Sequence, residues 1–486
     1  MKKINIWFAA TLLLGFTACN SVLDVKPKGS YTTGNYWRNQ ADVIDGISGI
    51  YNILLEEDFT GHAEFTFDIC SDDEFRAGDH AEDAAIETFT YDAGNPQVNF
   101  SWKWKYEMIN RANNALTYIP NVPGMDAAIR DRSLGEAHFL RAFAYWRLTL
   151  IYGEVPMVTE EDVKKGAYNH PKATVEALRT QIEADLLKAA ELLPAKYDES
   201  QAGRVHKGSA WGLLTKLYLY WDKLDKAIEF GSKVVGNNDY RLAANYADNF
   251  TTATSNNPEM LFNIQTMDGW GYSDFTTYHT PREWGGWNFH QPLKELVNEF
   301  EPNDPRKAVS VMQDGDMINV GNDVKRYNAS MSNTGYHFRK FTNWKSNGGL
   351  DYSLKTPLLR TADIYLLLAE AKIRKNGAGA GDAEINAVRR RASVLLPPVV
   401  GGGMAAVIHE RRVELSGENE RHQDLMRWDK AGIVNIAAMY SKPKTGPAGV
   451  LVPARTFQKP KHYYFPLPQA EVDRSRGVLE QNPNYK

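Results

Sequence analysis

Aromatic side chains gather in one stretch of this 486-residue sequence. Seven of the twenty residues from Trp270 to Phe289 are aromatic, whereas aromatic residues make up 12% of the whole chain. The stretch belongs to a longer region, about 239–356, in which helical periodicity is nearly lost and glycine and asparagine are frequent. Loops of this length in a compact protein are generally functional or disordered, and the aromatic content argues against disorder. We therefore expect the ligand-binding site in this region.

Motifs that would indicate an enzyme are scarce. The sequence contains no Gly-x-Ser-x-Gly, no Gly-x-x-x-x-Gly-Lys-Ser/Thr and no Gly-x-Gly-x-x-Gly, which removes the best-marked signals for hydrolases, nucleoside triphosphatases and dinucleotide enzymes. The adjacent carboxylates of Asp72 and Asp73 could serve a glycosidase, but such a pair is defined by its separation in space, which a sequence does not give. These motifs therefore point to no particular reaction.

One stretch resembles a calcium-binding loop. The run from Asp314 to Asp323 carries acidic residues and glycines at suitable positions, but Ile318 stands where an oxygen ligand should be. Calcium at this loop is therefore the less favoured alternative. We expect no bound metal ion and no cofactor.

Helical periodicity brackets the irregular region on both sides, because apolar residues recur three and four positions apart. The predicted helices cover about 39–54, 99–118, 127–151, 173–193, 206–221, 223–236, 359–376, 381–394 and 404–416. The helix at 127–151 is apolar nearly all the way round, which is typical of a helix in the middle of a bundle. Its Arg141 lies in the apolar sector and therefore needs a carboxylate from another element.

Two successive helix pairs indicate a repeat architecture. The helices at 206–221 and 223–236 combine small and large apolar residues so that two antiparallel helices can nest, and this pair resembles a tetratricopeptide unit. The ranges 359–376 and 381–394 form a second such pair. The predicted fold class is mostly α, a tetratricopeptide-like helical-repeat scaffold with a large irregular, aromatic-rich loop region.

The predicted organisation has one folded domain at 39–486. Its helical scaffold covers about 39–238 and 357–486, and the loop-rich ligand-binding region covers about 239–356. A hydrophobic content of 43% with 24% charged residues is typical of a soluble globular domain. The formal net charge of -4 makes nucleic acid a poor candidate partner.

The N-terminus has the pattern of an export signal. A basic pair at 2–3 precedes an apolar run at about 6–14, which is too short to span a membrane. The sequence Phe16-Thr17-Ala18-Cys19 resembles a bacterial lipobox, in which the signal is cut before the cysteine and the cysteine carries the acyl chains. We expect a lipoprotein signal peptide at 1–18, lipid on Cys19 and a tether at 19–38. An ordinary signal peptide is the alternative.

Six blocks of sequence together resemble the SusD/RagB family of surface nutrient-binding lipoproteins, and they occur in the order of that family. The blocks are LDVKPKG (23–29), WKYEMINRAN (104–113), EAHFLRAFAYWRLTLIYGEVPMV (136–158), LLRTADIYLLLAEA (358–371), ERRVELSGENERHQDLMRW (410–428) and YYFPLPQAEVDRSRGVLEQNPNY (463–485). Each block alone is a weak signal, but six in one order cover almost the full length of the chain. The combination is therefore specific.

This resemblance implies a protein that binds its ligand without converting it. Members of the family sit on the surface of the outer membrane as a lid over a TonB-dependent transporter of the SusC type. They capture an oligosaccharide, or in some members a peptide, for import. The resemblance also implies that the helices face the transporter while the irregular part carries the ligand. We therefore expect a non-enzymatic, glycan-binding lipoprotein. The alternatives are a peptide-binding member, a surface glycoside hydrolase and a pure protein-interaction scaffold.

Sugar chemistry selects the candidate site residues. Pyranose rings pack their C–H face on Trp or Tyr, while their hydroxyl groups bond to Asn, Asp, Arg or Gln. The expected ligand-binding residues are four aromatic platforms and four partners from the loops before the second predicted helix and from its first turn: Trp270, Tyr272, Trp284, Trp287, Asp72, Asp73, Arg76 and Trp102. Trp146 and Trp221 lie at helical core spacing, so we expect them to pack inside the scaffold.

Overall fold

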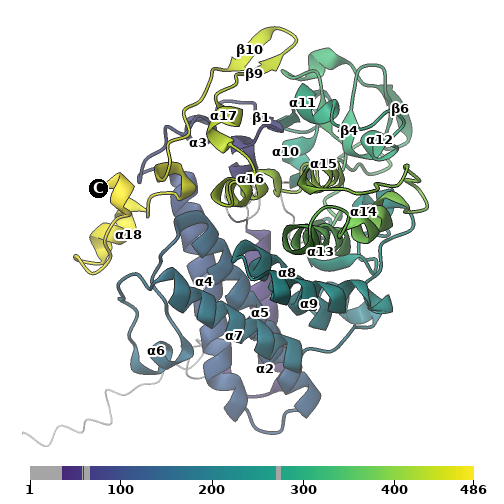
Figure 1. Ribbon diagram of the computed structural model, residues 1–486. Helices are drawn as coiled ribbons and strands as arrows, with labels where there is room; N and C mark the ends of the chain where they lie inside the picture. The colour runs from purple at the N-terminus through teal and green to yellow at the C-terminus, as the bar shows by residue number, and fades with distance from the viewer. Residues whose placement is uncertain (1–35, 57–58, 60–65, 270–274) are drawn as a thin grey trace, which may run out of the picture.

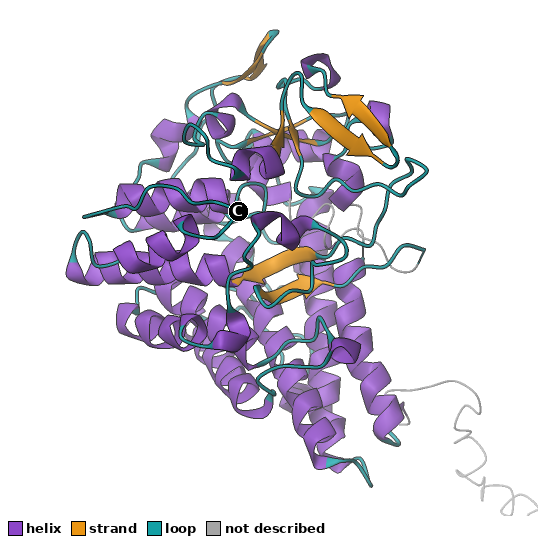
Figure 2. Cartoon of the chain, turned by 90° about the vertical axis from the view of Figure 1, so that its right-hand side faces the viewer, coloured by secondary structure: helices purple, strands orange, loops and turns teal. Residues whose placement is uncertain are grey.

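The structure is a computed structural model that describes residues 36–56, 59, 66–269 and 275–486. It is mostly helical, as the sequence predicts, with short strands joined in pairs (Figures 1 and 2). The α-helices are α2 (Gln40–Tyr51), α3 (Ala81–Glu87), α4 (Pro96–Tyr118), α5 (Ala127–Tyr152), α6 (Glu160–Lys165), α7 (Val175–Leu192), α8 (Lys207–Tyr220), α9 (Leu224–Val235), α10 (Phe275–His279), α11 (Lys294–Val297), α12 (Arg306–Ser310), α13 (Thr361–Asn376), α14 (Asp382–Arg389), α15 (Met404–Glu414), α16 (Arg421–Lys430), α17 (Ile436–Tyr440) and α18 (Gln469–Arg474). The strands are β1 (Glu74–Arg76), β2 (Met260–Ile264), β3 (His290–Pro292), β4 (Val311–Met312), β5 (Met317–Val320), β6 (Asp323–Arg326), β7 (His337–Phe338), β8 (Thr356–Arg360), β9 (Lys444–Gly446) and β10 (Gly449–Val452). Within the described ranges, no helix combines the length and the apolar character needed to cross a membrane.

A bundle built from α2, α4, α5 and α7 forms the lower part of the molecule in Figure 1. Helix α5 packs against the other three, and its buried residues point in all directions, which explains the all-round apolar sequence. Side-chain caps fix where these helices begin. Asn39 accepts hydrogen bonds from the N–H groups of Ala41 and Asp42, and Asp126 accepts one from the N–H of Ile129.

Arg141 in the middle of α5 has the carboxylate partner that the sequence requires. Its guanidinium is fully buried and donates to both carboxylate oxygens of Asp185 on α7, at 2.8 and 2.7 Å. It also donates to Oδ1 of Asn113 on α4 at 2.7 Å and pairs with Glu160. This buried charge therefore joins four helices, α4, α5, α6 and α7, and the prediction of an ion pair is confirmed.

The two predicted helix pairs form a second layer. Helices α8 and α9 lie side by side, and α13 packs on both of them and on α14. Gly231 permits this close approach, because a Cβ there would lie 3.1 Å from Cγ2 of Thr215 and 3.3 Å from Cβ of Leu368. The tetratricopeptide-like arrangement of the scaffold is therefore confirmed (Figure 1).

The chain between α9 and α13 contains short helices and strand pairs in place of a regular repeat. It supplies β2 through β8, which form antiparallel pairs with each other, except that β3 pairs with β1 outside the segment. In Figure 1 most of this segment lies at the upper right, above the long helices. Strand β8 runs directly into α13 and pairs with β2, so the start of the irregular segment is held against its end.

A buried ion network joins the irregular segment to α15 and to the turn after α14. Glu414 at the end of α15 lies 3.0 Å from Arg306, 3.2 Å from Arg360 and 2.9 Å from Arg391, measured between carboxylate oxygens and guanidinium nitrogens. Arg360 and Arg391 also share Glu259, the residue before β2. All five side chains are almost completely buried, so each charge depends on its partners.

Candidate ligand-binding site

Strand pairing brings two distant segments of the predicted site together. β1 pairs antiparallel with β3, with Glu74 opposite Pro292 and Arg76 opposite His290. The pairing continues on both sides, because the N–H of Ala77 donates to the carbonyl of Phe289 at 2.8 Å. The loop that contains Asp72, Asp73 and Arg76 therefore lies beside the aromatic stretch, although more than two hundred residues separate them in the sequence.

Trp287 presents its ring to solvent from the end of this aromatic stretch. Its side chain is 41% exposed, and its ring centroid lies 5.3 Å from that of Tyr278 and 5.5 Å from that of Phe289, both of which are buried. The backbone N–H of Trp287 donates to the carbonyl of Thr277 at 2.8 Å. The indole therefore packs on two buried rings.

Two polar side chains contact the backbone or the ring neighbours of this indole. Nε of Arg282 donates to the backbone carbonyl of Trp287 at 3.2 Å. On another side, the ring of His80 meets the ring of Phe289 edge to face at 5.3 Å, and its Nδ1 lies 2.8 Å from Oε1 of Glu82. We call Trp287, Tyr278, Phe289, His80 and Arg282 the aromatic surface. It combines an open ring face with hydrogen-bonding groups.

Arg76 supports the aromatic surface from below. Its guanidinium carbon lies 3.8 Å from the ring centroid of Phe289, and its Nε donates to Asp83 at 2.7 Å. The side chain is buried under the ring. Gly78 makes the approach possible, because a Cβ at this residue, whose φ is +101°, would lie 2.8 Å from Cε1 of Phe289. The structure therefore places Arg76 as a positioning residue.

Asp72 and Asp73 are tied to arginines of the scaffold. Nε of Arg421 donates to Asp72 at 2.8 Å, and Nε of Arg412 donates to Asp73 at 2.7 Å. Burial raises the pKa of Asp73, whereas at Asp72 the two arginines outweigh burial and hold the pKa below its usual range. These carboxylates fasten the loop to α15 and α16.

A neighbouring carboxyl group, Glu74, was not singled out from the sequence. Burial and the charge of Asp73 raise its pKa to about 8. Such a shift is often found in a catalytic acid. Glu74 is buried, however, and Nδ1 of His290 lies 3.0 Å from its carboxylate, so a substrate would not reach it. The raised pKa of Glu74 follows from its packing in the folded protein, so the sequence does not predict it.

The remaining predicted residues lie elsewhere or outside the described ranges. Trp284 is 6% exposed and packs its ring against Tyr327 and Trp344, with centroids 6.1 and 6.0 Å away. Trp102 on α4 is 5% exposed and lines a different cavity of about 690 Å³. Neither ring face is open to solvent as that of Trp287 is. Trp270, Tyr272 and the predicted lipid site Cys19 lie outside the described residues.

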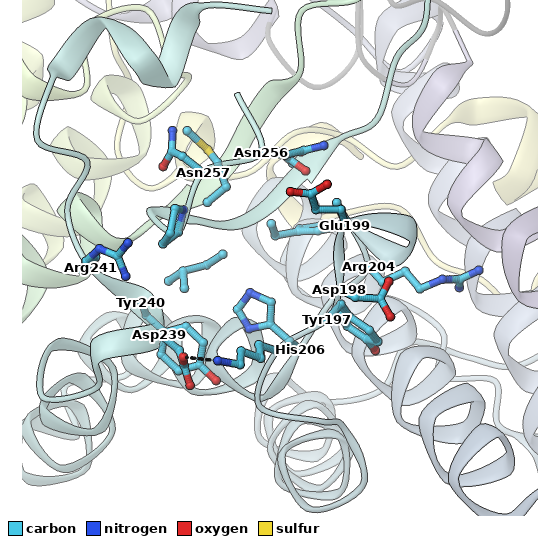
Figure 3. Close-up of a pocket in the computed structure, with 18 residues that line it drawn as sticks. Tyr197, Asp198, Glu199, Arg204, His206, Asp239, Tyr240, Arg241, Asn256 and Asn257 are labelled. Atoms are coloured by element: carbon cyan, nitrogen blue, oxygen red, sulfur yellow. Dashed lines mark hydrogen bonds and ion pairs between the residues drawn. The ribbon is translucent and has the colours of Figure 1, made fainter. Parts of the chain in front are cut away.

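A polar pocket of about 310 Å³ lies on the scaffold, between the loop before α8 and the strand β2 (Figure 3). Two of its charged groups pair with each other: Lys196 donates to Asp239 at 3.2 Å, as the dashed line in Figure 3 shows. His206 stacks on Tyr240 at 4.9 Å, and burial lowers the pKa of His206 to about 4. No sequence pattern marks this pocket, because its walls come from loops. The ring of Tyr240 in this pocket is buried, unlike that of Trp287.

The calcium-like run has an identifiable structural role. Residues 314–323 form a turn and the first strand of the β5–β6 hairpin, and Asp314 lies 3.8 Å from Arg326 across it. Within the part of the chain that the structure describes, no three His, Cys, Asp or Glu side chains come together in a group that could hold a metal ion. The absence of a cofactor stays a prediction.

Two family models match this chain and together span most of it. The model described as the SusD family matches residues 227–485. The model described as "Starch-binding associating with outer membrane" matches residues 22–219. The first of these alone covers more than half of the 486 residues.

Individual relatives agree with these models along the whole chain. The SusD-like protein P2 of Formosa agariphila is 26% identical over 527 residues, which cover 100% of both chains. The starch-binding protein SusD of Bacteroides thetaiotaomicron is 24% identical over 584 residues, again 100% of both chains. A solved laminarin-binding SusD-like protein is 26% identical and superposes with a TM-score of 0.77, covering 92% of this chain and 100% of the other. The resemblance seen in the sequence is confirmed, and the chain belongs to the SusD/RagB family.

Proposed function

We propose that this protein is a cell-surface glycan-binding protein that captures an oligosaccharide, without converting it, and delivers it to a TonB-dependent transporter of the SusC type. The observation that carries the proposal is the open indole of Trp287, held on Tyr278 and Phe289. Two similar proteins are named for the glycans they bind, laminarin in one case and starch in the other. The proposed contacts are the ring of Trp287 and the polar groups of His80 and Arg282.

The chemistry of the aromatic surface suits a sugar better than a compact polar ligand. A pyranose ring places its C–H face on an indole, and its hydroxyl groups then reach outward to donors and acceptors at the rim. Arg282, which donates to the backbone of Trp287, and His80, which contacts Phe289 and Glu82, supply such groups in the aromatic surface. Trp270 and Tyr272, which lie outside the described residues, are proposed as further contacts from the sequence alone.

The hydrolase alternative has less support. Catalysis by two carboxyl groups needs both to reach the glycosidic bond. Asp72 and Asp73 each form an ion pair with a scaffold arginine, and Glu74 is buried. A peptide-binding role remains the second candidate within the same family, because an indole face also packs on apolar side chains.

The test is a titration of the full chain with an oligosaccharide panel that includes laminarihexaose and maltohexaose. We expect saturable binding of at least one glycan by calorimetry, and chromatography should recover that glycan unchanged after long incubation. Accumulation of shorter products would support the hydrolase. Saturation by a peptide library with no response to any glycan would support the peptide-binding alternative.

The proposed location is the outer-membrane surface, with a lipid on Cys19 as the anchor. Two or more acyl chains hold a protein stably at a membrane, whereas one gives only reversible binding. We expect Cys19→Ala to leave a folded protein that is released from the membrane fraction, as fractionation and immunoblotting would measure. The matched control is Cys70→Ala, because Cys70 is buried and unpaired in the folded domain and should not affect anchoring. Full retention of the Cys19→Ala protein in the membrane fraction would contradict the anchor.

A further inference from the structure

A second pocket lies where α16 meets the C-terminal ends of α5 and α8 and the first turns of α7. In Figure 1, α16 lies above the upper ends of these bundle helices. The pocket has a volume of about 170 Å³. We propose that it binds a small, ring-bearing organic carboxylate. The inference does not rest on the proposed glycan function, because no residue of this pocket belongs to 239–356 or to the aromatic surface.

The charged side chains that line the pocket are all cationic. Its lining contains no aspartate or glutamate, and it contains these cationic side chains: Arg147, Arg179, Arg427 and Lys430. Arg427 is balanced by Asp424 and Glu370 behind it. Arg179 has Glu176 at 4.0 Å as its ion-pair partner, and the side chain of Glu176 is 73% exposed. An exposed pair of that length contributes little, so Arg179 keeps most of its capacity to bind an anion.

Two buried hydrogen-bond donors of the lining have no partner among the described residues. They are Nε1 of Trp146 and the hydroxyl of Tyr220, and their rings meet edge to face at 6.4 Å. Trp146 is 4% exposed, and its indole N–H can only donate. Buried donors in native proteins are nearly always bonded, so an acceptor is missing here. A carboxylate supplies acceptors and no donors.

The aromatic walls of the pocket favour a ligand whose uncharged part is a ring. Aromatic side chains line it from several elements, among them Phe67, Trp221, Tyr464 and Phe465. A cavity of about 150 Å³ lined by apolar side chains is large enough for benzene. Gln423 donates its amide to the carbonyl of Asn419 at 3.2 Å, which leaves its Oε1 unpartnered as an acceptor for a hydroxyl group on the ring.

The polar pocket in Figure 3 shows how this differs from an ordinary surface cavity. There, Asp198, Glu199 and Asp239 stand among the lining cations and balance their charge (Figure 3). The pocket at α16 has cations, unpartnered donors and aromatic walls without any such carboxylate in its lining. The missing negative charge is what the proposed ligand provides.

The probe is 4-hydroxybenzoate, titrated into the full chain by calorimetry, with 4-hydroxybenzamide as the uncharged analogue of the same shape. We expect saturable binding of the acid and at least tenfold weaker binding of the amide, because a hydrogen bond to a charged group is worth about that factor. Equal affinities, or no binding of the acid, would overturn the proposal.

Variants locate the site. Arg179→Gln should weaken binding of the acid about tenfold, whereas Lys188→Gln on the same helix, paired with Glu191 away from the pocket, should leave it unchanged. Trp146→Phe keeps an aromatic ring and removes the indole N–H, so it should also weaken binding of the acid. The melting temperature of this variant checks that it is folded. Trp287→Ala should have no effect on this affinity. If the Arg179→Gln and Trp146→Phe proteins both bind the acid as tightly as the unchanged chain does, the assignment of the binding site to this pocket is wrong.

Discussion

Glu414→Gln should lower the free energy of unfolding by about 3–5 kcal/mol, the usual cost of removing one partner from a buried ion pair. Glu414 is fully buried against Arg306, Arg360 and Arg391. The amide keeps the shape of the side chain and removes its charge, so three guanidinium groups lose part of their compensation. Chemical denaturation of the two proteins at neutral pH would measure the difference.

The matched control is Glu229→Gln. Glu229 forms a salt bridge of 2.6 Å with Lys233 on the same helix, but its side chain is 55% exposed. An exposed pair of this kind contributes about 0.3–0.5 kcal/mol. A loss at Glu414→Gln no larger than the loss in this control would show that the buried network does not hold the irregular segment to the scaffold.

The same network makes a prediction about pH. Burial alone would raise the pKa of Glu414, but Arg391, Arg360 and Arg306 outweigh it and lower the pKa from 4.5 to about 2. Because the folded pKa lies below the unfolded one, this carboxylate stabilises the fold above pH 4.5 and loses that effect as the pH falls towards 2. The difference in unfolding free energy between the wild-type chain and Glu414→Gln should therefore shrink over this interval. Other groups change the unfolding free energy in the opposite direction as the pH falls, such as Glu74, whose pKa is raised. These contributions are the same in both proteins, so they cancel in the difference.

The helical scaffold could be predicted from the sequence because its information is local. The range 127–151 was recognised from an all-round apolar pattern, and the helix runs from Ala127 to Tyr152. The need for a partner at Arg141 followed from the cost of a buried charge. The sequence did not identify Asp185 as that partner, because the two helices are far apart along the chain and nothing local links them.

The candidate site was harder to predict because its geometry is set by distant contacts. Trp284 and Trp287 stand three residues apart in the same aromatic stretch, yet one is 6% and the other 41% exposed. Between them the chain turns at Gly285, whose φ is +96°, and the β1–β3 pairing fixes which side faces outward. Composition identified the stretch, but a sequence does not give the direction of a side chain on an irregular loop.

The ion pairs of Asp72 and Asp73 could not be predicted because their partners are distant in the sequence. Asp72 and Asp73 pair with Arg421 and Arg412, about 340 residues later. Trp146 and Trp221 are expected inside the scaffold from their spacing. Trp146 is buried in the core and Trp221 packs against that core, as expected, and both also line the pocket beside α16. Helical spacing identifies the inward face of a helix, but it does not show where that face meets a cavity.

Trp287→Ala should be the most damaging single change to glycan binding. The ring is the open platform of the aromatic surface, and Tyr278 and Phe289 already hold it in place. Truncating an anchoring tryptophan at a binding site costs about 2 kcal/mol or more, which corresponds to a loss of affinity of about thirtyfold. Because the side chain is partly exposed and sits on a loop, the fold itself should change little in stability.

The measurement that tests the central claim most directly is calorimetric titration of the glycan that binds tightest to the full chain into three proteins: the unchanged chain, Trp287→Ala and Tyr168→Ala. Tyr168 is an aromatic residue of the scaffold with 56% exposure, so its removal controls for the loss of a surface ring. The proposed function predicts a loss of about thirtyfold in affinity for Trp287→Ala and none for Tyr168→Ala, with similar melting temperatures. Unchanged affinity of the Trp287→Ala protein would contradict the assignment of the aromatic surface as the glycan site.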